Sequence, residues 1–439
     1  MSNLNKTIRP WASSEDAGGS FLIYYLKISL IRYNGTMIMP TRLLATAIAL
    51  AACFFSARAA LGAASTTLVP ISTPSAAVVA PADPNHFVFA VGGDNRPPGH
   101  GDPMPPSLNE ICREIGWIRP SFVIWTGDSI YGYMDTPAEA SAEYNSFLSS
   151  AALCGVPVFS VPGNHEIGAA NLAPVYQAKM GALYGSFDYG NSHFIGLDTT
   201  PVVGGEVEEG DLDDTQWKWL EADLAAHSGK SANIFVFFHH YMFGLPDPDT
   251  PNGPDTGLKD TATRDRLHHL FVKYGVRAVF NGHAHLYYHT AKDGIDYYIA
   301  GNAGAPMDAP PENGGFLGYM MVQVDGSKIA ATAIPAWDLN VRPLAGRAPD
   351  GSVSVAVDDA MFSDLDLRGI TIQVPVGSYS VSATAANKAG KAKQVDASIL
   401  STTPSPDGKT EIVTIEAHVP HARTTILTLT PSSGAASGG

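Results

Sequence analysis

Cysteine is scarce in this chain, with three residues in 439. Cys53 lies in an apolar N-terminal run, so only Cys112 and Cys154 remain in the body of the chain. In an oxidising compartment these two could form one disulfide, and two buried free thiols are the equally open alternative. Neither cysteine lies among the polar clusters described below, which argues against a catalytic thiol.

Basic residues are also few. The chain has 27 Lys and Arg against 42 Asp and Glu, which gives a formal net charge of −15. An acidic chain repels nucleic-acid backbones at long range, so we do not expect a nucleic-acid duplex as partner. If the substrate is an anion, the chain needs a local positive centre, and bound metal ions would supply one.

The N-terminus lacks an apolar run of membrane-spanning length. Met39–Arg42 gives a short basic start, Leu43–Phe55 is an apolar run, and small residues follow through Ala64. This order is typical of a secretory signal, and the run is too short and too rich in Ala for a membrane span. We therefore predict that residues 1–64 are an upstream extension and signal peptide, and that the protein is exported to the periplasm or the extracellular space.

Two alternatives concern the same N-terminal segment. Phe21–Ile31 is a short apolar stretch that would act as a membrane anchor, although it contains Lys27. Leu50–Cys53 resembles a lipoprotein cleavage box, so a lipidated Cys53 would tether the chain to a membrane.

Internal repeats and low-complexity bulk are absent, and the length predicts two domains with tails. Residues 65–84 are rich in Pro, Ala, Ser and Thr, which indicates a flexible linker. We expect a catalytic domain over 85–337, a loop-like linker over 338–351 and a disordered polar tail over 432–439. In residues 352–431, segments of period two lie between Gly, Pro and Asn or Asp, which is typical of a small all-β domain.

Short apolar runs in residues 85–337 each end at a polar cluster. The runs are Phe87–Val91, Phe122–Trp125, Val156–Val161, Phe194–Leu197, Ile234–Phe238 and Arg277–Phe280. Runs of this length without alternation predict strands that are buried on both faces. The helix candidates are Leu108–Ile118, Ala138–Leu153, Thr215–Ala226 and Thr263–Tyr274. This alternation predicts an α/β fold, in which functional groups gather beyond the carboxyl ends of the strands.

The polar clusters have the side chains that a dinuclear metal site needs. They contain Asp94, Asp128, Asn164, His239 or His240, His283 and His285. Two metal ions ~3.5–4 Å apart can clamp the attacking and leaving oxygens of a phosphoryl transfer. Such a site needs hard anionic ligands, with neutral imidazoles in the remaining positions. Glycines precede four of these residues, and we expect them to permit sharp turns at the strand ends.

Five blocks carry a resemblance to a known family. They are Gly-Asp94-Asn-Arg96, Gly-Asp128-Ser-Ile-Tyr131, Gly-Asn164-His165-Glu166, His239-His240 and Gly-His283-Ala-His285. In this order they resemble the signature of the calcineurin-like metallophosphoesterases, over about Phe87 to Ala305. The resemblance implies a four-layer αββα sandwich with two metal ions, followed here by the small all-β C-terminal domain.

The resemblance also implies a role for each matching residue. Asp128 would bridge the two ions, Asp94 and His285 would hold the first ion, and Asn164, His239 and His283 would hold the second. The family uses the first His of the pair, which favours His239 over His240. His165 would act on the leaving group as an acid or as a hydrogen-bond donor to phosphate, and Glu166 would orient His165.

One block departs from the common pattern of the family. Many members have a His where this chain has Arg96, which stays protonated and cannot ligate a metal. The purple acid phosphatases also lack that His and use a Tyr three residues after the bridging Asp, which is Tyr131 here. The ligand set therefore leans towards that branch, where Fe(III) bound to Tyr partners Zn, Mn or Fe. Alternatively, Tyr131 is a loop aromatic and water fills the position. Arg96 either binds a substrate phosphate oxygen or pairs with a nearby acid.

We therefore expect a metal-dependent phosphoric ester hydrolase. It would act on small-molecule phosphate monoesters like an acid phosphatase, through in-line attack of a metal-bound hydroxide. The nearest alternative is a phosphodiesterase acting on cyclic nucleotides, glycerophosphodiesters or phospholipid headgroups, because the same metals serve both reactions. An exported binding protein with a degenerate metal site is the alternative of another class, and the intact ligand blocks argue against it.

Overall fold

The computed structural model describes residues 31–33, 36–38, 67–74, 77–169, 171–244, 256–344, 346–360, 364–406 and 408–432. The chain divides into two units, residues 1–64 and 65–439. In the first unit, β1 (Ile31–Tyr33) pairs antiparallel with β2 (Thr36–Ile38). The predicted cleavage region, Cys53 and the tail beyond residue 432 lie outside the described residues. Among the described residues, no helix has the length and hydropathy of a membrane span.

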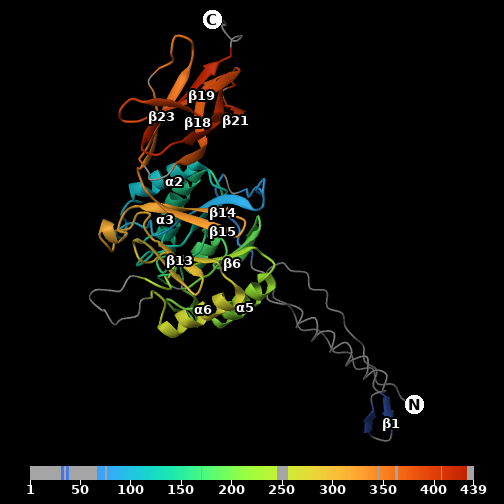
Figure 1. Cartoon of the computed structure of the whole chain (residues 1–439). Helices are drawn as coiled ribbons and strands as arrows, with labels where there is room; N and C mark the ends of the chain where they lie inside the picture. Colours follow the sequence, from blue (N-terminus) through green and yellow to red (C-terminus); the bar gives the residue numbers. More distant parts are fainter. Residues whose placement is uncertain are drawn as a thin grey trace. The chain divides into compact units, whose positions relative to one another are not determined.

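Two β-sheets form the centre of the second unit (Figure 1). The first has the order β15 (Lys328–Pro335), β14 (Gly318–Asp325), β3 (His86–Gly92), β4 (Val123–Trp125) and β5 (Val158–Ser160). The second has the order β12 (Tyr287–Lys292), β13 (Ile295–Ala300), β11 (Ala278–Asn281), β10 (Asn233–Phe237), β7 (Ser192–Gly196) and β6 (Gly185–Tyr189). Strands β3, β4 and β5 are parallel to one another, as are β7, β10, β11 and β13.

An aromatic core lies between the two sheets. Phe89 of β3 stacks on Phe122 with ring centroids 5.3 Å apart. It also meets Phe194 and Phe280 of the second sheet edge-on, at 5.3 and 5.7 Å. Full burial of such a side chain stabilises the fold by roughly 1.5–3 kcal/mol. The apolar runs that predicted buried strands therefore supply both inner faces.

Helices cover the outer faces of both sheets, which confirms the αββα sandwich. Helices α2 (Pro106–Ile118), α3 (Pro137–Ala151) and α4 (Ala173–Lys179) pack on the first sheet, and α5 (Asp214–His227) and α6 (Thr261–Tyr274) on the second. Helix α3 begins at a capping box formed by Thr136 and Glu139. Helix α6 is capped at its start by the Asp260 side chain and at its end by Gly275 in the left-handed conformation. The short elements between them are η1 (Ala152–Cys154), β8 (Val202–Val203), β9 (Glu206–Val207) and η2 (Pro311–Asn313).

The C-terminal region contains two antiparallel sheets, as the period-two pattern predicted. One has the order β16 (Leu339–Pro343), β17 (Val353–Asp359), β23 (Arg423–Pro431), β19 (Tyr379–Ala386) and β20 (Ala392–Val395). The other has the order β18 (Leu365–Pro375), β22 (Thr410–Val419) and β21 (Ala397–Pro404). Strand β18 packs against α2, where a Cβ on Gly369 would lie 1.7 Å from the Gly116 carbonyl oxygen.

Two segments differ from their predicted linker character. Leu68 and Ile71 are buried, and their N–H groups donate to the carbonyls of Ser186 and Val158 at 3.0 and 2.8 Å. The flexible-linker prediction is therefore wrong for this part of residues 65–84, because its isolated apolar residues enter the core without any periodic pattern. Residues 338–351 are not all loop either, since β16 pairs antiparallel with β17 through this stretch.

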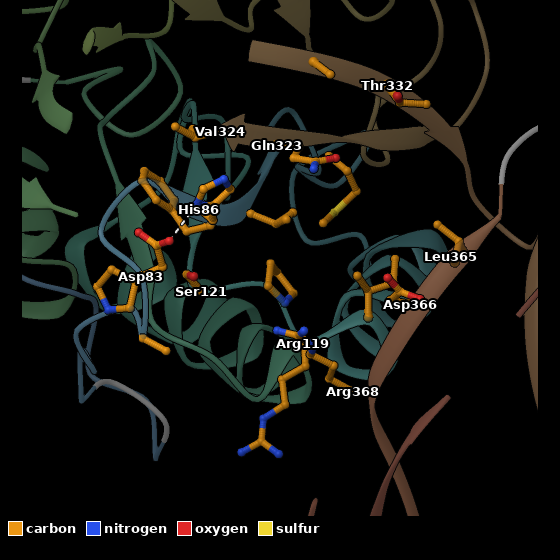
Figure 2. Close-up of a pocket in the computed structure, with 18 of the residues that line it drawn as sticks. Asp83, His86, Arg119, Ser121, Gln323, Val324, Thr332, Leu365, Asp366 and Arg368 are labelled. Carbon is orange, nitrogen blue, oxygen red and sulfur yellow. Dashed lines mark hydrogen bonds and ion pairs between the residues drawn. The ribbon is translucent and has the colours of Figure 1, made fainter. Parts of the chain in front are cut away.

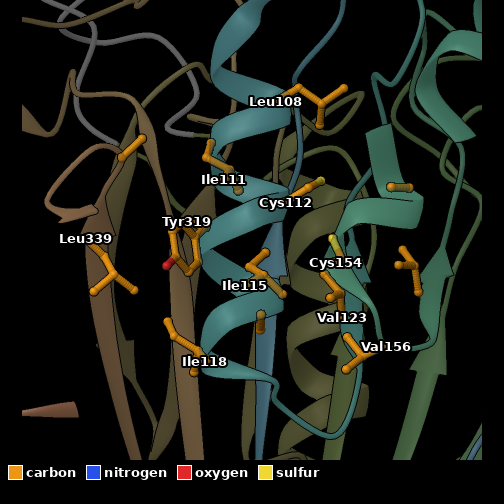
Figure 3. Packing of buried hydrophobic residues seen from close by; sticks show 14 of the residues in the cluster. Leu108, Ile111, Cys112, Ile115, Ile118, Val123, Cys154, Val156, Tyr319 and Leu339 are labelled. Atoms are coloured by element: carbon orange, nitrogen blue, oxygen red, sulfur yellow. The ribbon is translucent and has the colours of Figure 1, made fainter. Parts of the chain in front are cut away.

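Cys112 and Cys154 are buried, unbridged thiols in the described structure. Figure 3 shows them among apolar side chains of α2, including Ile111 and Ile115. Of the two readings that the sequence left open, the structure therefore has the thiol form.

Candidate metal centre

The carboxyl ends of strands from both sheets bring five predicted ligands together. Asp94 follows β3, Asp128 follows β4, Asn164 follows β5, His239 follows β10 and His283 follows β11. Because these strands run parallel within each sheet, their ends lie at one edge. A sixth predicted ligand, His285, is two residues beyond His283. Its Nε2 lies 3.8 Å from Asp94 Oδ1.

Three of these residues have unusual backbone conformations. Asp94, Asp128 and His283 have φ values of 58°, 54° and 71°. Residues other than glycine rarely adopt this left-handed region, and each instance costs of order 1–3 kcal/mol. Such strain is typical of functional sites, where the surrounding structure holds a side chain in a required direction.

The glycines before the ligands serve mainly to leave room. Only Gly127, before Asp128, has a positive φ among the four that the sequence singled out. A Cβ on Gly163 would lie 2.2 Å from Asp128 Oδ1, and a Cβ on Gly282 would lie 2.2 Å from Asp94 Oδ2. The expected sharp turns therefore explain one glycine, while close approach of a carboxylate explains these two.

His239 presents a lone pair to two other acceptors. Its Nδ1 lies 3.0 Å from the Thr126 carbonyl oxygen, which can only accept, so Nδ1 carries the proton. Burial lowers the pKa of His239 to about 3, so the ring is neutral and Nε2 has a free lone pair. That Nε2 lies 2.8 Å from Asn164 Oδ1 and 3.3 Å from Asp128 Oδ1. Three electron-rich atoms that face one another without a proton between them require a cation.

His283 brings a further ring nitrogen to this group. Its Nδ1 lies 3.2 Å from both Asn164 Oδ1 and His239 Nε2. His240 turns the other way, since its Nδ1 lies 2.8 Å from the Thr199 hydroxyl. The structure thus brings His239, and not His240, to Asp128.

The carboxylates concentrate negative charge inside the protein. Asp94 and Asp128 are both buried. Burial and then the charge of Asp128 raise the pKa of Asp94 well above its ordinary value. Asp94, Asp128 and His239 have ligand atoms within 4.8 Å of one another. Buried carboxylates beside neutral imidazoles fit hard divalent or trivalent cations.

Arg96 lies beside the cluster rather than in solvent. Its Nε is 3.6 Å from Asp128 Oδ2, and its Nη1 donates to the Pro97 carbonyl at 3.3 Å. Of the two roles left open for Arg96, the structure shows the contact with an acid, which is the predicted bridging carboxylate of Asp128.

His165 also faces the cluster. Its Nδ1 contacts the Tyr131 carbonyl oxygen, and its Nε2 lies 3.8 Å from Asp128 Oδ2. The Tyr131 ring packs against the rings of His165 and His100, with centroids 5.7 and 6.2 Å away. Within the described residues, no hydrogen bond joins the Tyr131 hydroxyl to Asp94 or Asp128.

Glu166 has a different role from the one that the resemblance implied. It is fully buried, and its carboxylate accepts hydrogen bonds from the N–H groups of Asp128, Ser129 and Gly163. The ring of His165 is held by the Tyr131 carbonyl instead. Glu166 therefore positions the backbone that carries Asp128 and Asn164.

Sequence reasoning missed a residue that orients Asn164. The Asn164 amide donates to the Tyr133 hydroxyl at 2.8 Å, and that hydroxyl donates to Glu209 Oε1 at 2.9 Å. Burial raises the pKa of Tyr133 to about 12, so the phenol keeps its proton. With its N–H₂ group held, Asn164 directs Oδ1 towards His239. Glu209 is 76 residues from Tyr133, so no local pattern could have paired them.

The orientation of His285 was also unpredicted. Its Nδ1 lies 2.8 Å from the Pro306 carbonyl, and its backbone N–H donates to Asp308 at 2.8 Å. The carbonyl fixes the proton on Nδ1 and leaves Nε2 for Asp94. Metal-ligating histidines commonly have such a partner on the second ring nitrogen.

A pocket of about 600 Å³ lies elsewhere, between the first sheet and β18 (Figure 2). His86, Arg119, Gln323 and Arg368 are among its lining residues. His86 is held between Asp83 and Asp325, at 2.8 and 2.6 Å. None of the predicted metal ligands lines this pocket, so it is separate from the candidate metal centre.

Known proteins resemble the part of the chain that carries this centre. A family model described as calcineurin-like phosphoesterase matches residues 89–287. The serine/threonine-protein phosphatase CPPED1 of Pongo abelii is 24% identical over 216 residues, which are 48% of this chain and 66% of that protein. The probable glycerophosphodiester phosphodiesterase GpdQ of Arcobacter nitrofigilis is 29% identical over 178 residues, or 38% of this chain and 57% of that protein. The chain thus matches less than two thirds of the length of either relative.

Among solved structures, a dimetal phosphatase of Danio rerio aligns with a TM-score of 0.44 at 15% identity. The alignment covers 57% of this chain and 96% of that one.

Proposed function

Residues 89–287 of this chain form a calcineurin-like phosphoesterase domain, and on that premise we propose that the protein is a metal-dependent hydrolase of phosphate monoesters. The observation that carries the proposal is the set of facing acceptors, His239 Nε2, Asn164 Oδ1 and Asp128 Oδ1. Two ions would share Asp128, with Asp94 and His285 on one side and Asn164, His239 and His283 on the other. When bound, the ions supply positive charge for the phosphoryl oxygens and lower the pKa of water.

The chain's own residues then bind and orient the ester. Arg96 contributes a fixed positive charge beside Asp128, so its guanidinium can bind phosphoryl oxygens in a bidentate way. His165 has its Nδ1 held by the Tyr131 carbonyl, which leaves Nε2 to face the leaving-group oxygen. Only the imidazolium form has a proton on that nitrogen to assist departure of the alcohol, and burial lowers the pKa of His165, so this assistance is favoured at acidic pH.

The charge of Arg96 favours a monoester over a diester. A monoester phosphate carries up to two negative charges near neutral pH, and a diester carries one. A cationic side chain within 3.6 Å of the predicted bridging carboxylate adds attraction for the second charge. Phosphodiester hydrolysis remains the second candidate, because one similar protein is named as a probable glycerophosphodiester phosphodiesterase.

The test compares p-nitrophenyl phosphate with bis-p-nitrophenyl phosphate on the purified protein, loaded in turn with iron, zinc and manganese. We expect the wild type to prefer the monoester, and Asp128→Asn to be almost inactive towards both. Arg96→Gln removes charge-assisted hydrogen bonds of about 1.5–3 kcal/mol each. It should therefore lower kcat/KM for the monoester by about 10- to 150-fold, and for the diester by less.

Arg113→Gln is the matched control, because Arg113 pairs with Glu110 on the surface of α2. This variant should keep wild-type rates with both esters. A preference of the wild type for the diester would replace the monoester proposal by the second candidate. If a folded protein with full metal content hydrolyses neither ester, the hydrolase proposal itself is wrong.

A further inference from the structure

A second group of ligand-type side chains lies where the loop after β3 meets the start of α3. His100 is in that loop, Asp135 comes just before the N-cap residue Thr136, and Glu139 is in the first turn of the helix. One ligand atom from each of His100, Asp135 and Glu139 lies within 4.8 Å of the other two. None of the three is a predicted ligand of the candidate metal centre, so they form a separate cluster.

Asp135 is the unusual member of this cluster. Its side chain is only 1% exposed, yet neither carboxylate oxygen accepts a hydrogen bond of ordinary geometry from any described residue. Taking a carboxylate out of water without such bonds is costly, and buried polar groups in folded proteins nearly always have a partner. The bare carboxylate therefore indicates that a cation or an ordered water belongs beside it.

His100 approaches Asp135 from the side. Its Nε2 lies 3.1 Å from Asp135 Oδ1, but an N–H on that nitrogen does not point at the oxygen well enough to form a hydrogen bond. Two ligands of one metal ion have this relation, because each points at the ion and not at the other ligand. No described residue hydrogen-bonds to Nδ1 of His100, whose side chain is 39% exposed. Nδ1 can therefore carry the ring proton towards water and leave Nε2 its lone pair.

Glu139 can join the set without giving up its place in the helix cap. Its Oε2 accepts hydrogen bonds from the N–H and the hydroxyl of Thr136, both at 2.8 Å. Its Oε1 lies 4.0 Å from His100 Nε2. An ion about 2.0–2.2 Å from each donor holds donors that are up to about 4 Å apart. Both distances to Nε2 fit one ion, and the half-exposed side chain of Glu139 is free to adjust towards Asp135.

The charges of the cluster also favour a cation. Burial raises the pKa of Asp135, His100 opposes the rise, and Glu139 adds to it. One imidazole neutralises at most one of the two carboxylates, and only when it is protonated. A divalent ion neutralises both carboxylates and leaves the imidazole as a neutral ligand.

We propose that His100, Asp135 and Glu139 bind one divalent transition-metal ion of the class of Zn²⁺ and Mn²⁺. One imidazole with two carboxylates is a ligand set that such ions accept, and water can fill the remaining positions. The ion can enter from solvent, because the side chains of His100 and Glu139 are 39% and 51% exposed. The proposal does not depend on the hydrolase reaction.

The ion would join the loop after β3 to the segment between β4 and α3. That segment carries Tyr131, whose ring packs against His100 with centroids 6.2 Å apart. It also carries Tyr133, whose hydroxyl holds the Asn164 amide. An ion at this position would therefore stabilise one side of the candidate metal centre. Because an ion that binds only the folded state stabilises it, metal should raise the melting temperature.

The competing state is a plain ion pair between protonated His100 and Asp135, with water on the remaining carboxylate oxygen. Metal content distinguishes the two states, because the ion pair takes up no metal.

The experiment measures bound zinc by elemental analysis, after equilibrium dialysis of the metal-stripped full chain against micromolar zinc. Asp135→Asn keeps the shape of the side chain and removes its charge, so it should bind about one equivalent less than wild type. Glu139→Gln should also lose zinc, and it keeps the helix cap because Gln serves in a capping box. Glu221→Gln is the matched control, since Glu221 is a 56% exposed glutamate that pairs with Lys273 at 3.1 Å. This control should bind as much zinc as wild type.

Repeating the comparison in the Asp128→Asn background separates this cluster from the candidate metal centre. The loss caused by Asp135→Asn should persist there, and zinc should raise the melting temperature of Asp128→Asn more than that of the double variant. A loss that occurs only when Asp128 is intact would assign the ion to the candidate metal centre and overturn the proposal. Equal zinc contents in wild type, Asp135→Asn and Glu139→Gln, all folded, would overturn it as well. If Asp135→Asn folds poorly, Glu139→Gln alone decides, because its side chain is half exposed.

Discussion

Glu114 makes the stability of this protein depend on pH in a direction that can be worked out. It lies on α2 and is completely buried, and its carboxylate accepts the Trp337 N–H at 2.6 Å. Trp337 lies between β15 and β16, so this contact ties α2 to the start of the C-terminal strands. Burial raises the pKa of Glu114 from 4.5 to about 8. The folded protein therefore keeps a proton on Glu114 at neutral pH, and the unfolded chain does not.

The sign of the effect follows from the proton count. Below pH 4.5 Glu114 is protonated in both the folded and the unfolded state, so its ionisation takes nothing from the free energy of unfolding there. As the pH rises towards about 8, only the unfolded state has released the proton, so stability falls. Over that interval, at about 1.36 kcal/mol per pH unit, the loss is about 5 kcal/mol at most.

Glu114→Gln removes the titration and keeps an oxygen that can accept the Trp337 N–H. Urea unfolding at several pH values, followed by tryptophan fluorescence, gives the free energy of unfolding of each protein. The stability of the variant relative to wild type should rise by several kcal/mol between pH 5 and pH 8.5. Glu221→Gln, on α5, should show no such rise, because Glu221 pairs with Lys273 at the surface. If the free energies of unfolding of Glu114→Gln and wild type differ by an amount that stays constant within about 1 kcal/mol from pH 5 to pH 8.5, the reasoning is refuted.

Further predictions concern the metal centre and the thiols. His239→Ala should lose metal and more than about 100-fold of the rate, whereas His240→Ala should keep its metal, because only His239 faces the other acceptors. Metal analysis with initial rates tests this, and equal losses in both would contradict it. If Tyr131 ligates Fe(III), Tyr131→Phe should remove a visible absorption band and one metal ion; an unchanged spectrum and rate would make Tyr131 a loop aromatic. Cys112 and Cys154 should react with a thiol reagent only after unfolding, and a disulfide found by mass spectrometry would exclude the thiol form.

The strand ends could be located from the sequence because burial on both faces leaves a clear signal. A continuous apolar run such as Phe122–Trp125 must stop where the chain leaves the core, and the first polar residues mark that edge. The apolar run alone left His239 and His240 open, and only the resemblance to the family favoured His239. Successive side chains near a strand end point to opposite sides, and one residue of uncertainty in register exchanges them. Only the packed sheet shows which ring meets Asp128.

Other features depend on contacts between distant residues, which leave no pattern in the neighbouring sequence. Leu68 and Ile71 lie in a Pro-rich segment, so their burial follows from the surface that the two central sheets offer. Helix α4 has seven residues, which is too short for an apolar period to be visible. Tyr133 acts through a residue far along the chain, and its role follows from the fold alone.

The position of Glu166 shows why the site can hold strained residues. Asp128 has a left-handed backbone, which costs of order 1–3 kcal/mol, yet its peptide N–H donates to Glu166 at 2.8 Å. The same carboxyl group accepts the Gly163 N–H at 2.7 Å, so one buried side chain fixes the loops after β4 and β5 together. Burial raises the pKa of Glu166 to about 7, so the group is charged above that pH, where its hydrogen bonds are worth about 1.5–3 kcal/mol each and offset that strain. The distance between Asp128 and Asn164 is thereby set by the backbone before any metal binds, and Glu166 contributes to the site without facing the substrate.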